Sequence, residues 1–373
     1  MPLRVLHCPD IVGGNPGGLA AAERELGLES WTVGLRPSPY GFAVDEVLWD
    51  EGDGPLAREL ERWGLVFRAM RHFDVVHFNF GSTIAPEWAS GSTGRFSPWA
   101  IYSSVFEQLD LRLLARAGKA IFVTFQGDDA RQGAVASSFA VNASVEAPPG
   151  YYTPRSDADK RRRIARFERY ADGIYALNPD LLRVLPARTT FVPYAHLDPR
   201  TWQPGPPAGN RERPLVLHAP TNREIKGTRF VLDAVERLRA ERISFDFRLV
   251  EGVSHSEVRS LYERADLVVD QLLIGWYGGL AVELMALGRP VIAYLRDEDL
   301  EVLPPDMRAE IPVIPAQPAT IYAVLKELLT RRREELPEIG RRGREYVERW
   351  HDPLKIAAGV VADYERAVER CRA

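Results

Sequence analysis

Short apolar runs alternate with longer amphipathic stretches along the first half of the chain, and polar loops separate them. Apolar runs bounded by turn residues predict strands buried on both faces, and longer stretches with helical periodicity predict helices. The expected strands are 3–8, 31–35, 74–80, 120–127, 173–177 and 189–194, and the expected helices are 17–27, 55–73, 104–118 and 156–171. Repeated strand–helix units of this kind predict an α/β fold with a doubly wound parallel sheet.

A proline-rich stretch, "DPRTWQPGPPAGNRERP", interrupts this pattern after residue 197. It contains five prolines and few side chains that could pack, so it predicts a linker at 198–213. The strand–helix pattern then restarts, and "PLVLHAP" at 214–220 is similar to "RVLHCPD" near the N-terminus. Further strands are expected at 245–252, 265–273, 290–295 and 312–315.

Two similar halves predict two Rossmann-like parallel-sheet domains that face each other across a cleft. We expect these domains at 1–197 and 214–352, followed by an amphipathic helix at 353–373. The length agrees with this division, because 373 residues are typical of about two domains. Ligands of such sheets bind outside the carboxyl ends of the strands, so candidate residues are sought in the loops that follow strands.

One carboxylate, Glu283, lies in the middle of the apolar stretch "DQLLIGWYGGLAVELMALGRPVIAY" at 270–294. The stretch predicts a short helix at 278–287, which Gly288 ends, and then a buried strand. A carboxylate buried there without a partner would cost several kcal/mol. Two vicinal hydroxyls of a ligand, such as those of a ribose, would satisfy it. A salt bridge within the domain, for instance to Arg296, is the structural alternative.

Glycines and cations occupy other strand-following loops of this half. Gly278 and Gly279 open the helix that carries Glu283, and free amides at a helix start attract an anion such as a diphosphate. Arg223 and Lys226 lie in the loop of "HAPTNREIKGTRF", where two cations can neutralise a diphosphate. The alternative for this pair is two solvated loop charges.

The loop "DIVGGNPGGLAAAERELG" at 10–27 has glycines at positions 13, 14, 17 and 18. Its spacing differs from GxGxxG, and the next strand ends without the acid that holds a ribose, so a nicotinamide site is disfavoured. We expect the loop residues to face an acceptor or a diphosphate. These residues are Gly14, Asn15, Gly17 and Gly18.

Polar side chains also follow two other strands of the first half. Gln126, in "VTFQGDDAR", comes directly off a buried strand and is placed to hydrogen-bond a ligand, as is Asn79 in "HFNFGS". Asp128 and Asp129 lack a third ligand at metal-binding spacing, so we expect one of them to begin a helix. The scattered histidines form no triad with Asp and Ser.

Composition excludes several classes of protein. A net charge of −4 argues against nucleic acid or an anionic membrane as the main partner, and 45% hydrophobic residues are ordinary for a globular protein. Two distant cysteines give neither a disulfide framework nor a zinc site, and no signal peptide or membrane span is visible, which favours the cytoplasm. The basic run "KRRR" at 160–163 is interpreted as a solvated helix face, with an anionic-surface patch as the alternative.

Taken together, these motifs resemble the GT-B glycosyltransferases of the family 4 type over essentially the whole chain. That family typically reads PS-x-x-E-G-F-G-x-x-x-x-E-A-M-A-x-G-x-P-V-I, and "WYGGLAVELMALGRPVIA" fits the second half of this motif. The resemblance implies that Glu283 holds the nucleotide ribose and that the stretch 250–255, which includes Val253, contacts the nucleobase. It also implies that the helix at 353–373 crosses back onto the first domain.

The chain departs from the family pattern at two positions. The first glutamate of the motif, which normally touches the donor sugar, falls on Gly275, and Asp270 and Gln271, just upstream, are the candidates to substitute for it. The histidine often found after the fourth strand is Gln126. These departures are typical of a divergent bacterial branch, or of an inactive one.

The sequence therefore predicts an enzyme that transfers a sugar from a nucleoside diphosphate donor to a hydroxyl of a glycan, lipid or small molecule. Arg223, Lys226 and Gln126 are the expected catalytic residues, and retention without a metal or cofactor is expected. Peripheral membrane association and the oligomeric state are left open. A nucleotide-sugar epimerase on the same fold and a non-catalytic nucleotide-sugar binding protein are the alternatives.

Overall fold

The computed structural model describes residues 1–38, 41–50, 52–87, 97–253 and 255–372. The chain forms two compact units. Unit 1 consists of Met1–Val135, Tyr152–His196 and Pro353–Ala373, and unit 2 consists of Ala136–Tyr151 and Leu197–Asp352. Within the described residues, no helix combines the length and the apolar character that a membrane crossing requires.

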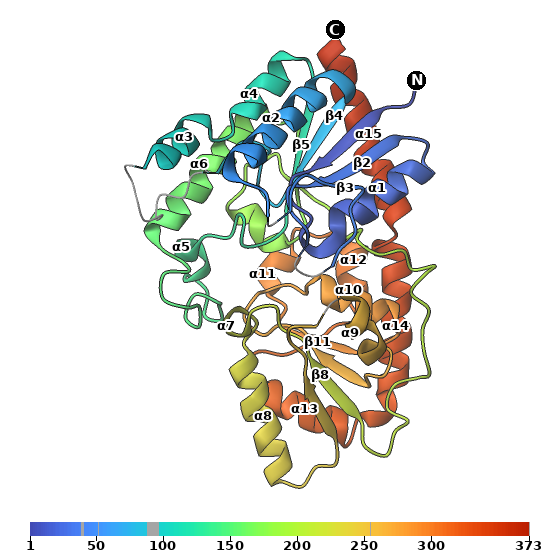
Figure 1. The fold of residues 1–373 in the computed structure, drawn as a ribbon. Helices are drawn as coiled ribbons and strands as arrows, with labels where there is room; N and C mark the ends of the chain where they lie inside the picture. Colours follow the sequence, from blue (N-terminus) through green and yellow to red (C-terminus); the bar gives the residue numbers. More distant parts are fainter. Residues whose placement is uncertain (39–40, 51, 88–96, 254, 373) are drawn as a thin grey trace. The chain divides into compact units, whose positions relative to one another are not determined.

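Unit 1 is built on a seven-stranded sheet in the order β3-β2-β1-β4-β5-β6-β7, and every strand pair is parallel (Figure 1). The strands are β1 Arg4–Cys8, β2 Glu29–Gly34, β3 Glu46–Val47, β4 Val75–Asn79, β5 Ala120–Phe125, β6 Gly173–Ala176 and β7 Thr190–Phe191. The expected strands of the first half are confirmed, and β3 is an addition. The order reverses beside β1, so the carboxyl ends of β1 and β4 form the switch point where ligands bind in such sheets.

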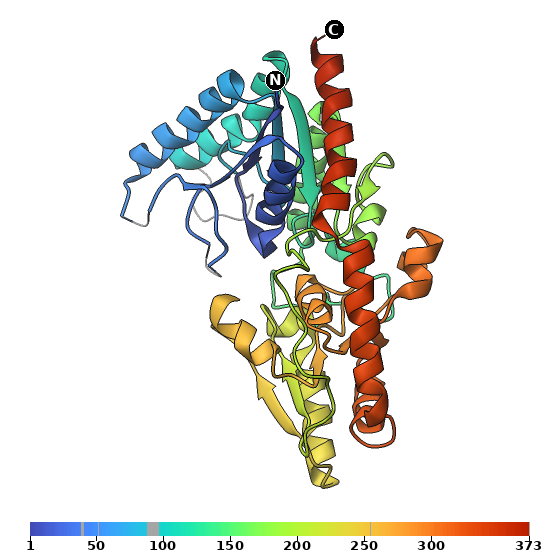
Figure 2. The ribbon, with the colours of Figure 1, turned by 90° about the vertical axis from the view of Figure 1, so that its right-hand side faces the viewer.

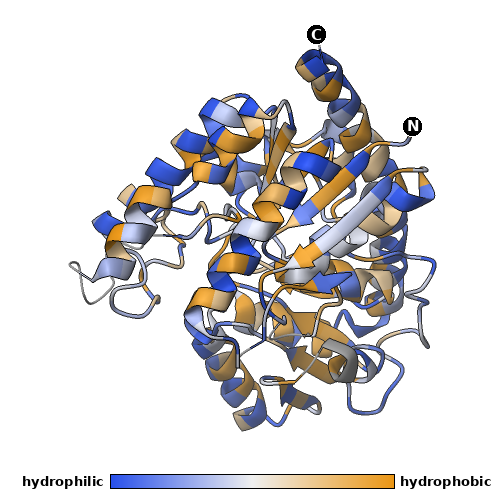
Figure 3. Cartoon of the chain, turned by 45° about the horizontal axis from the view of Figure 1, so that its top comes forward, coloured by the Kyte–Doolittle hydropathy of each residue, from blue (hydrophilic) through white to orange (hydrophobic). Residues whose placement is uncertain are grey.

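Helices cover both faces of this sheet, and two apolar cores result. The helices are η1 Val12–Gly14, α1 Asn15–Glu25, α2 Pro55–His72, α3 Pro98–Phe106, α4 Leu109–Arg116, α5 Gly133–Ala136, α6 Pro154–Tyr170, η2 Pro179–Arg183 and α15 Pro353–Arg372. Helices α2, α4 and α6 share one core with the sheet, and α1 and α15 share the other (Figure 2). Hydrophobic residues dominate the buried strands (Figure 3), as the sequence pattern predicts.

The single helix expected at 104–118 is wrong, because the chain breaks there into α3 and α4. Gln108 adopts a left-handed conformation with φ 54°, and the buried Glu107 before it faces α6. Glu107 accepts hydrogen bonds from Arg162, Arg163 and Arg166. These charge-assisted bonds outweigh the helical periodicity of the sequence.

The buried hydroxyl of Tyr364 attaches α15 to the sheet of unit 1. It donates to Glu23 Oε1 at 3.1 Å and accepts from His77 Nδ1 on β4. Glu23 also accepts from His7 at 2.8 Å and from Ser30 at 2.6 Å. Burial lowers the pKa of His77 well below its ordinary value, so this imidazole is neutral at pH 7. The network joins the end of the chain to β1, β4 and α1.

Unit 2 contains a second parallel sheet of five strands, in the order β12-β11-β10-β8-β9. The strands are β8 Leu215–His218, β9 Asp246–Leu249, β10 Leu267–Val269, β11 Val291–Ala293 and β12 Ile314–Pro315. The helices are α7 Arg223–Lys226, α8 Thr228–Ala240, α9 His255–Tyr262, α10 Gly279–Ala286, α11 Asp297–Leu300, α12 Pro305–Glu310, α13 Ile321–Leu329, η3 Arg333–Glu335 and α14 Leu336–Trp350. If β8 to β12 are numbered 1 to 5, the order across the sheet is 2-1-3-4-5. The switch point therefore lies between β8 and β10.

The proline-rich segment after residue 197 packs onto unit 2 and is more than a solvated linker. Trp202 and Ala208 are buried. Arg344 of α14 donates hydrogen bonds to the carbonyls of Pro199 and Trp202, which satisfies backbone groups that a segment without regular structure leaves unpaired. The prolines of this segment correctly indicate that it forms neither helix nor strand. Its attachment to α14 uses backbone carbonyls, which every residue has, so the sequence gives no sign of it.

Candidate functional site

An ion pair marks the switch point of the five-stranded sheet. Lys226, the last residue of the short helix α7 after β8, places its Nζ 2.9 Å from Oδ1 of Asp270, which directly follows β10. The Asp270 side chain is fully buried, and that of Lys226 is 14% exposed. A buried charge pair at the carboxyl ends of two adjacent strands lies where doubly wound sheets bind their ligands.

The local sequence explains why Lys226 lies there. Asn222 caps the short helix α7 by accepting a hydrogen bond from Ile225 N at 3.0 Å. Gly227 then reverses the chain with φ 77°, and a Cβ at this position would lie 3.1 Å from the Leu273 side chain. The carbonyl of Lys226 accepts from the Leu272 amide, which ties this turn to the loop after β10.

Gly278 completes the arrangement from the start of α10. Its amide donates to Oδ2 of Asp270 at 2.6 Å, and a Cβ at Gly278 would lie 3.3 Å from both Asp270 and Lys226. The sequence assigned this amide to a diphosphate, whereas in the structure it stabilises the buried aspartate. Gly279 is the first residue of α10, where backbone amides have no carbonyl partner one turn earlier.

Glu283 lies one turn into α10 and is buried, as expected. Its neighbourhood includes Tyr262, whose pKa is raised first by burial and then by the nearby carboxylates of Glu283 and Asp270. Arg296, the salt-bridge partner considered for Glu283, forms its ion pair with Asp299 at 2.6 Å. Glu283 is nevertheless engaged within the protein. Its burial alone therefore does not require a ligand. The case for a ligand contact rests on its position at the carboxyl edge of the sheet.

Arg223 and Val253 lie at the same edge but on the surface. Arg223 forms a bidentate pair with Glu251, which follows β9, and this pair lowers the pKa of the Glu251 carboxyl. Val253 is exposed in the same loop, and Ser254, part of the expected nucleobase segment, lies outside the described residues. Gln271 is buried and donates to the carbonyl of Trp276, so its amide supports the loop before α10.

Position 275 has no room for a side chain. A Cβ on Gly275 would lie 2.6 Å from Arg296 Cβ and 3.1 Å from Asp299 Oδ2. Gly275 stands where the family motif has its first glutamate, and the buried Arg296–Asp299 pair occupies the space that a side chain at this position would need. Asp299 has no sequence signal of its own, because an aspartate within "RDEDL" is indistinguishable from its solvated neighbours.

His218, at the end of β8, is a further residue that the sequence pattern does not single out. Its Nδ1 donates to the Val269 carbonyl at 2.8 Å, and its Nε2 accepts from the Thr228 hydroxyl at 2.8 Å. Burial, and to a smaller extent the Lys226 charge, lowers the pKa of His218 to about 4. A neutral imidazole therefore holds β8, β10 and α8 together beneath the ion pair.

In unit 1, Asn79 is the last residue of β4, and Gln126 directly follows the neighbouring strand β5. Asn79 is buried and donates to the His77 carbonyl at 3.1 Å, and its Oδ1 has no partner within the described residues. The Nε2 of Gln126 is likewise buried and without a partner there. A Cβ on Gly13, after β1, would lie 3.7 Å from Gln126 Oε1. Two buried polar atoms at the carboxyl edge of this sheet therefore lack a hydrogen-bond partner among the described residues.

The glycine loop after β1 has a structural role in this arrangement. Asn15 Oδ1 accepts from the Ala195 amide at 2.8 Å, and a Cβ on Gly18 would lie 2.1 Å from the Ala195 carbonyl oxygen. Gly14 caps α1 in a left-handed conformation. Gly17 has more room, because its Cβ would lie 3.6 Å from the nearest atom, Ala43 O.

The aspartates after β5 stabilise a turn. Asp129 accepts from the amides of Gln126 and Gly127, and burial raises its pKa to about 6. Asp128 pairs with Arg131 at 2.9 Å. Within the described residues, no group of three His, Cys, Asp or Glu side chains is arranged to hold a metal ion.

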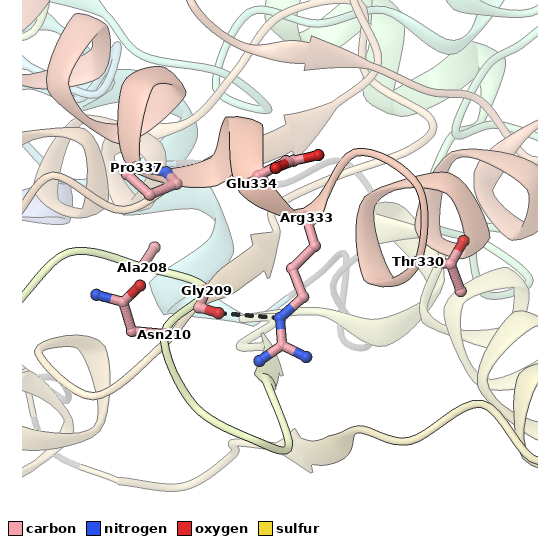
Figure 4. Close-up of a pocket in the computed structure, with 7 residues that line it drawn as sticks. All are labelled: Ala208, Gly209, Asn210, Thr330, Arg333, Glu334 and Pro337. Atoms are coloured by element: carbon pink, nitrogen blue, oxygen red, sulfur yellow. Dashed lines mark hydrogen bonds between the residues drawn. The ribbon is translucent and has the colours of Figure 1, made fainter.

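A shallow hollow of about 350 Å³ lies elsewhere on unit 2 (Figure 4). Arg333 crosses it and donates to the Gly209 carbonyl at 2.9 Å. Its lining residues are Ala208, Gly209, Asn210, Thr330, Arg333, Glu334 and Pro337. It contains none of the residues expected to act on a ligand.

Two units with parallel sheets, covered by helices, define the GT-B fold, and comparisons with known proteins agree. The structure superposes on the Anabaena protein HepE, solved in complex with UDP and glucose, with a TM-score of 0.60 and 10% identity over 98% of this chain and 100% of that one. It also superposes on a UDP-N-acetylglucosamine 2-epimerase with a TM-score of 0.52 and 12% identity, over 97% of this chain and 95% of that one. At these identities the likeness establishes the fold alone.

One sequence relative comes from the curated proteins. The MMP α-(1→4)-mannosyltransferase of Mycolicibacterium hassiacum is 29% identical in an alignment of 225 residues, and the match covers 53% of this chain and 52% of that protein. The matched part thus spans about half the length of the relative. No protein-family model matches the chain.

Proposed function

We propose that the protein is a glycosyltransferase that moves a sugar from a nucleoside diphosphate donor to a hydroxyl acceptor, with retention and without a metal ion. The observation that carries this proposal is the Lys226–Asp270 ion pair at the switch point of the five-stranded sheet, where Asp270 also accepts the amide of Gly278, the N-cap of the helix that carries Glu283. The mannosyltransferase relative and the UDP complex of a protein with the same fold support it.

Lys226 and Arg223 would neutralise the diphosphate. One donor of the Lys226 ammonium is used by Asp270, and the group has three. Asp270 fixes the position of the ammonium while the remaining donors face the ligand. Arg223 is held by Glu251 on the surface, where ion pairs are weak, so it can exchange this partner for a phosphate at little cost. Both cations would stabilise the charge that develops on the departing diphosphate.

Glu283 would accept hydrogen bonds from the two ribose hydroxyls. An ionised carboxylate has two acceptor oxygens, and vicinal hydroxyls can bond to both at once. Gly279, at the start of the same helix, would donate its amide to a phosphate oxygen. The exposed loop with Val253 would contact the base.

The acceptor would bind at the carboxyl edge of the sheet of unit 1. Asn79 Oδ1 can accept from an acceptor hydroxyl, and Gln126 Nε2 can donate to one. Leaving such buried atoms unpaired costs about 1–3 kcal/mol each, so a polyhydroxyl ligand that pairs with them gains this energy on binding. A sugar or a sugar-containing molecule fits this requirement.

An epimerase is the second candidate, because a UDP-N-acetylglucosamine 2-epimerase shares the fold. The two activities differ in what happens to the donor. A transferase releases free nucleoside diphosphate only when an acceptor is present, and an epimerase changes the sugar nucleotide without an acceptor. A binding protein does neither.

The test is to incubate the protein with mannose and glucose donors of each base, with and without a mixture of hydroxyl acceptors, and to follow all nucleotides by chromatography and mass spectrometry. Acceptor-dependent release of nucleoside diphosphate, with a product heavier than the acceptor by one hexosyl group, is the expected result. Conversion of the donor sugar without an acceptor would establish the epimerase instead. Stereochemistry follows from the anomeric coupling of the product in NMR.

A further inference from the structure

Helix α2 exposes large apolar side chains along one line. Leu56, Leu60 and Phe67 are 75%, 67% and 60% exposed. They are spaced by four and seven residues, so they share one face of the helix. Isolated exposed apolar residues need no explanation, but three on one helical face indicate an interaction surface.

Helix α3 extends this apolar surface. It contains no charged residue, and its Trp99, Ile101 and Val105 are 51%, 55% and 65% exposed. Trp63 of α2 holds the two helices together, because its indole N–H donates to the Tyr102 hydroxyl of α3 at 2.6 Å. The exposed apolar residues of α2 and α3 therefore belong to adjoining helices of unit 1 (Figure 1).

The helices on this side of the sheet are strongly basic. Helices α2, α4 and α6 pack side by side, and together they carry 13 Lys and Arg against 6 Asp and Glu, a net charge of +7. The whole chain has a net charge of −4. Positive charge is thus concentrated on the side that also exposes apolar side chains.

We propose that unit 1 docks through α2 and α3 onto the surface of an anionic lipid bilayer. The apolar side chains of α2 and α3 would enter the boundary between headgroups and acyl chains, and the surrounding arginines would contact lipid phosphates. A second copy of the chain fits less well, because two basic surfaces repel each other. This inference does not depend on the proposed transferase activity.

The run "KRRR" contributes to this charge in a way that the sequence did not indicate. Arg162 and Arg163 surround the buried Glu107, and Lys160 donates to the Arg131 carbonyl at 2.6 Å. Their positions are fixed by these contacts, whereas Arg71 of α2 is exposed and lies four residues after Phe67, on the same face. Arg71 is therefore the best single test of the electrostatic contribution.

The experiment is co-sedimentation with vesicles of phosphatidylcholine alone and of phosphatidylcholine mixed equally with phosphatidylglycerol. The wild type should bind the mixed vesicles, and added salt should weaken binding. Arg71→Gln should weaken it about fivefold. The double variants Leu60→Ser/Phe67→Ser and Ile101→Ser/Val105→Ser should each weaken it by about tenfold or more.

Two exposed valines of unit 2 supply matched controls. Val145→Ser and Val302→Ser should bind as the wild type does, and thermal unfolding shows whether each variant is folded. Absence of binding to mixed vesicles, equal binding by all folded variants, or equal binding to neutral vesicles would overturn the proposal. A concentration-dependent dimer that the α2 and α3 variants abolish would identify a second copy as the occupant and would also overturn it. The assay contains neither donor nor acceptor, so its failure leaves the proposed transferase activity untouched.

Discussion

Lys226 Nζ and Asp270 Oδ1 lie 2.9 Å apart at the carboxyl ends of β8 and β10. The same aspartate accepts the Gly278 amide, so one buried carboxylate orients both a cation and the start of α10. This arrangement fixes the Lys226 ammonium beside the start of α10.

The first prediction concerns the stability that this pair provides. Asp270→Ala should lower the free energy of unfolding by about 3–5 kcal/mol, because it leaves the nearly buried Lys226 charge and the Gly278 amide without a partner. Urea unfolding measures this change. Asp246→Asn, which alters the exposed partner of Arg213, is the control and should change stability by less than about 1 kcal/mol. A small loss in Asp270→Ala would show that the pair does not organise the site.

The second prediction concerns Gly275. Gly275→Ala should destabilise the protein by about 1–3 kcal/mol, because the new Cβ would overlap Arg296. Gly64→Ala, within α2, is the matched control, since no atom lies within 4 Å of its added Cβ. This control should be neutral or slightly stabilising. If both variants unfold at the same denaturant concentration, the space at position 275 is larger than the structure indicates.

The third prediction concerns Asp110, whose pKa burial raises to about 6 from an ordinary value of 3.8. A carboxyl with a raised folded-state pKa stabilises the fold fully below its unfolded pKa, and this contribution is lost as pH rises through the folded pKa. Between pH 4 and 7 the wild type should therefore lose about 2 kcal/mol relative to Asp110→Asn. Unfolding curves of both proteins across this range give the difference. A constant difference would mean that Asp110 titrates normally.

The fourth prediction concerns the attachment of α15. Tyr364→Phe should cost about 1–3 kcal/mol, because it leaves His77 and Glu23 without one buried hydrogen bond each. Tyr322→Phe removes an exposed hydroxyl that bonds to Glu241 and should cost less than about 0.5 kcal/mol. Equal losses in the two variants would contradict the structural role of the buried network.

Much of the fold could be predicted because its signals are local. Buried parallel strands are short apolar runs, and the glycine after β8 and the proline-rich segment mark turns and loops directly. The break at Gln108 could not be predicted, because it depends on contacts between Glu107 and arginines more than fifty residues away.

The candidate site shows the same division. Lys226, Asp270, Gly278 and Glu283 were each identified from the loop or helix that carries them. Their mutual contacts were not, because Lys226 and Asp270 are 44 residues apart and meet only when β8 and β10 pair. The sequence therefore identifies the residues, but the hydrogen bonds between them follow from strand pairing. As a result, the Gly278 amide, expected to bind a phosphate, donates to Asp270.

The central claim is that Glu283 lies in a nucleoside diphosphate site. The most direct measurement is thermal unfolding of the wild type, Glu283→Ala and Asp266→Asn with UDP, GDP, ADP, TDP and CDP. Asp266 is a buried carboxylate at the opposite end of β10, so its variant controls for lost stability. Ligand at ~100 times its dissociation constant adds about 2.7 kcal/mol. We predict that one diphosphate stabilises the wild type and Asp266→Asn, and that folded Glu283→Ala loses this response. Absence of stabilisation by every diphosphate, or an equal response in Glu283→Ala, would contradict the claim.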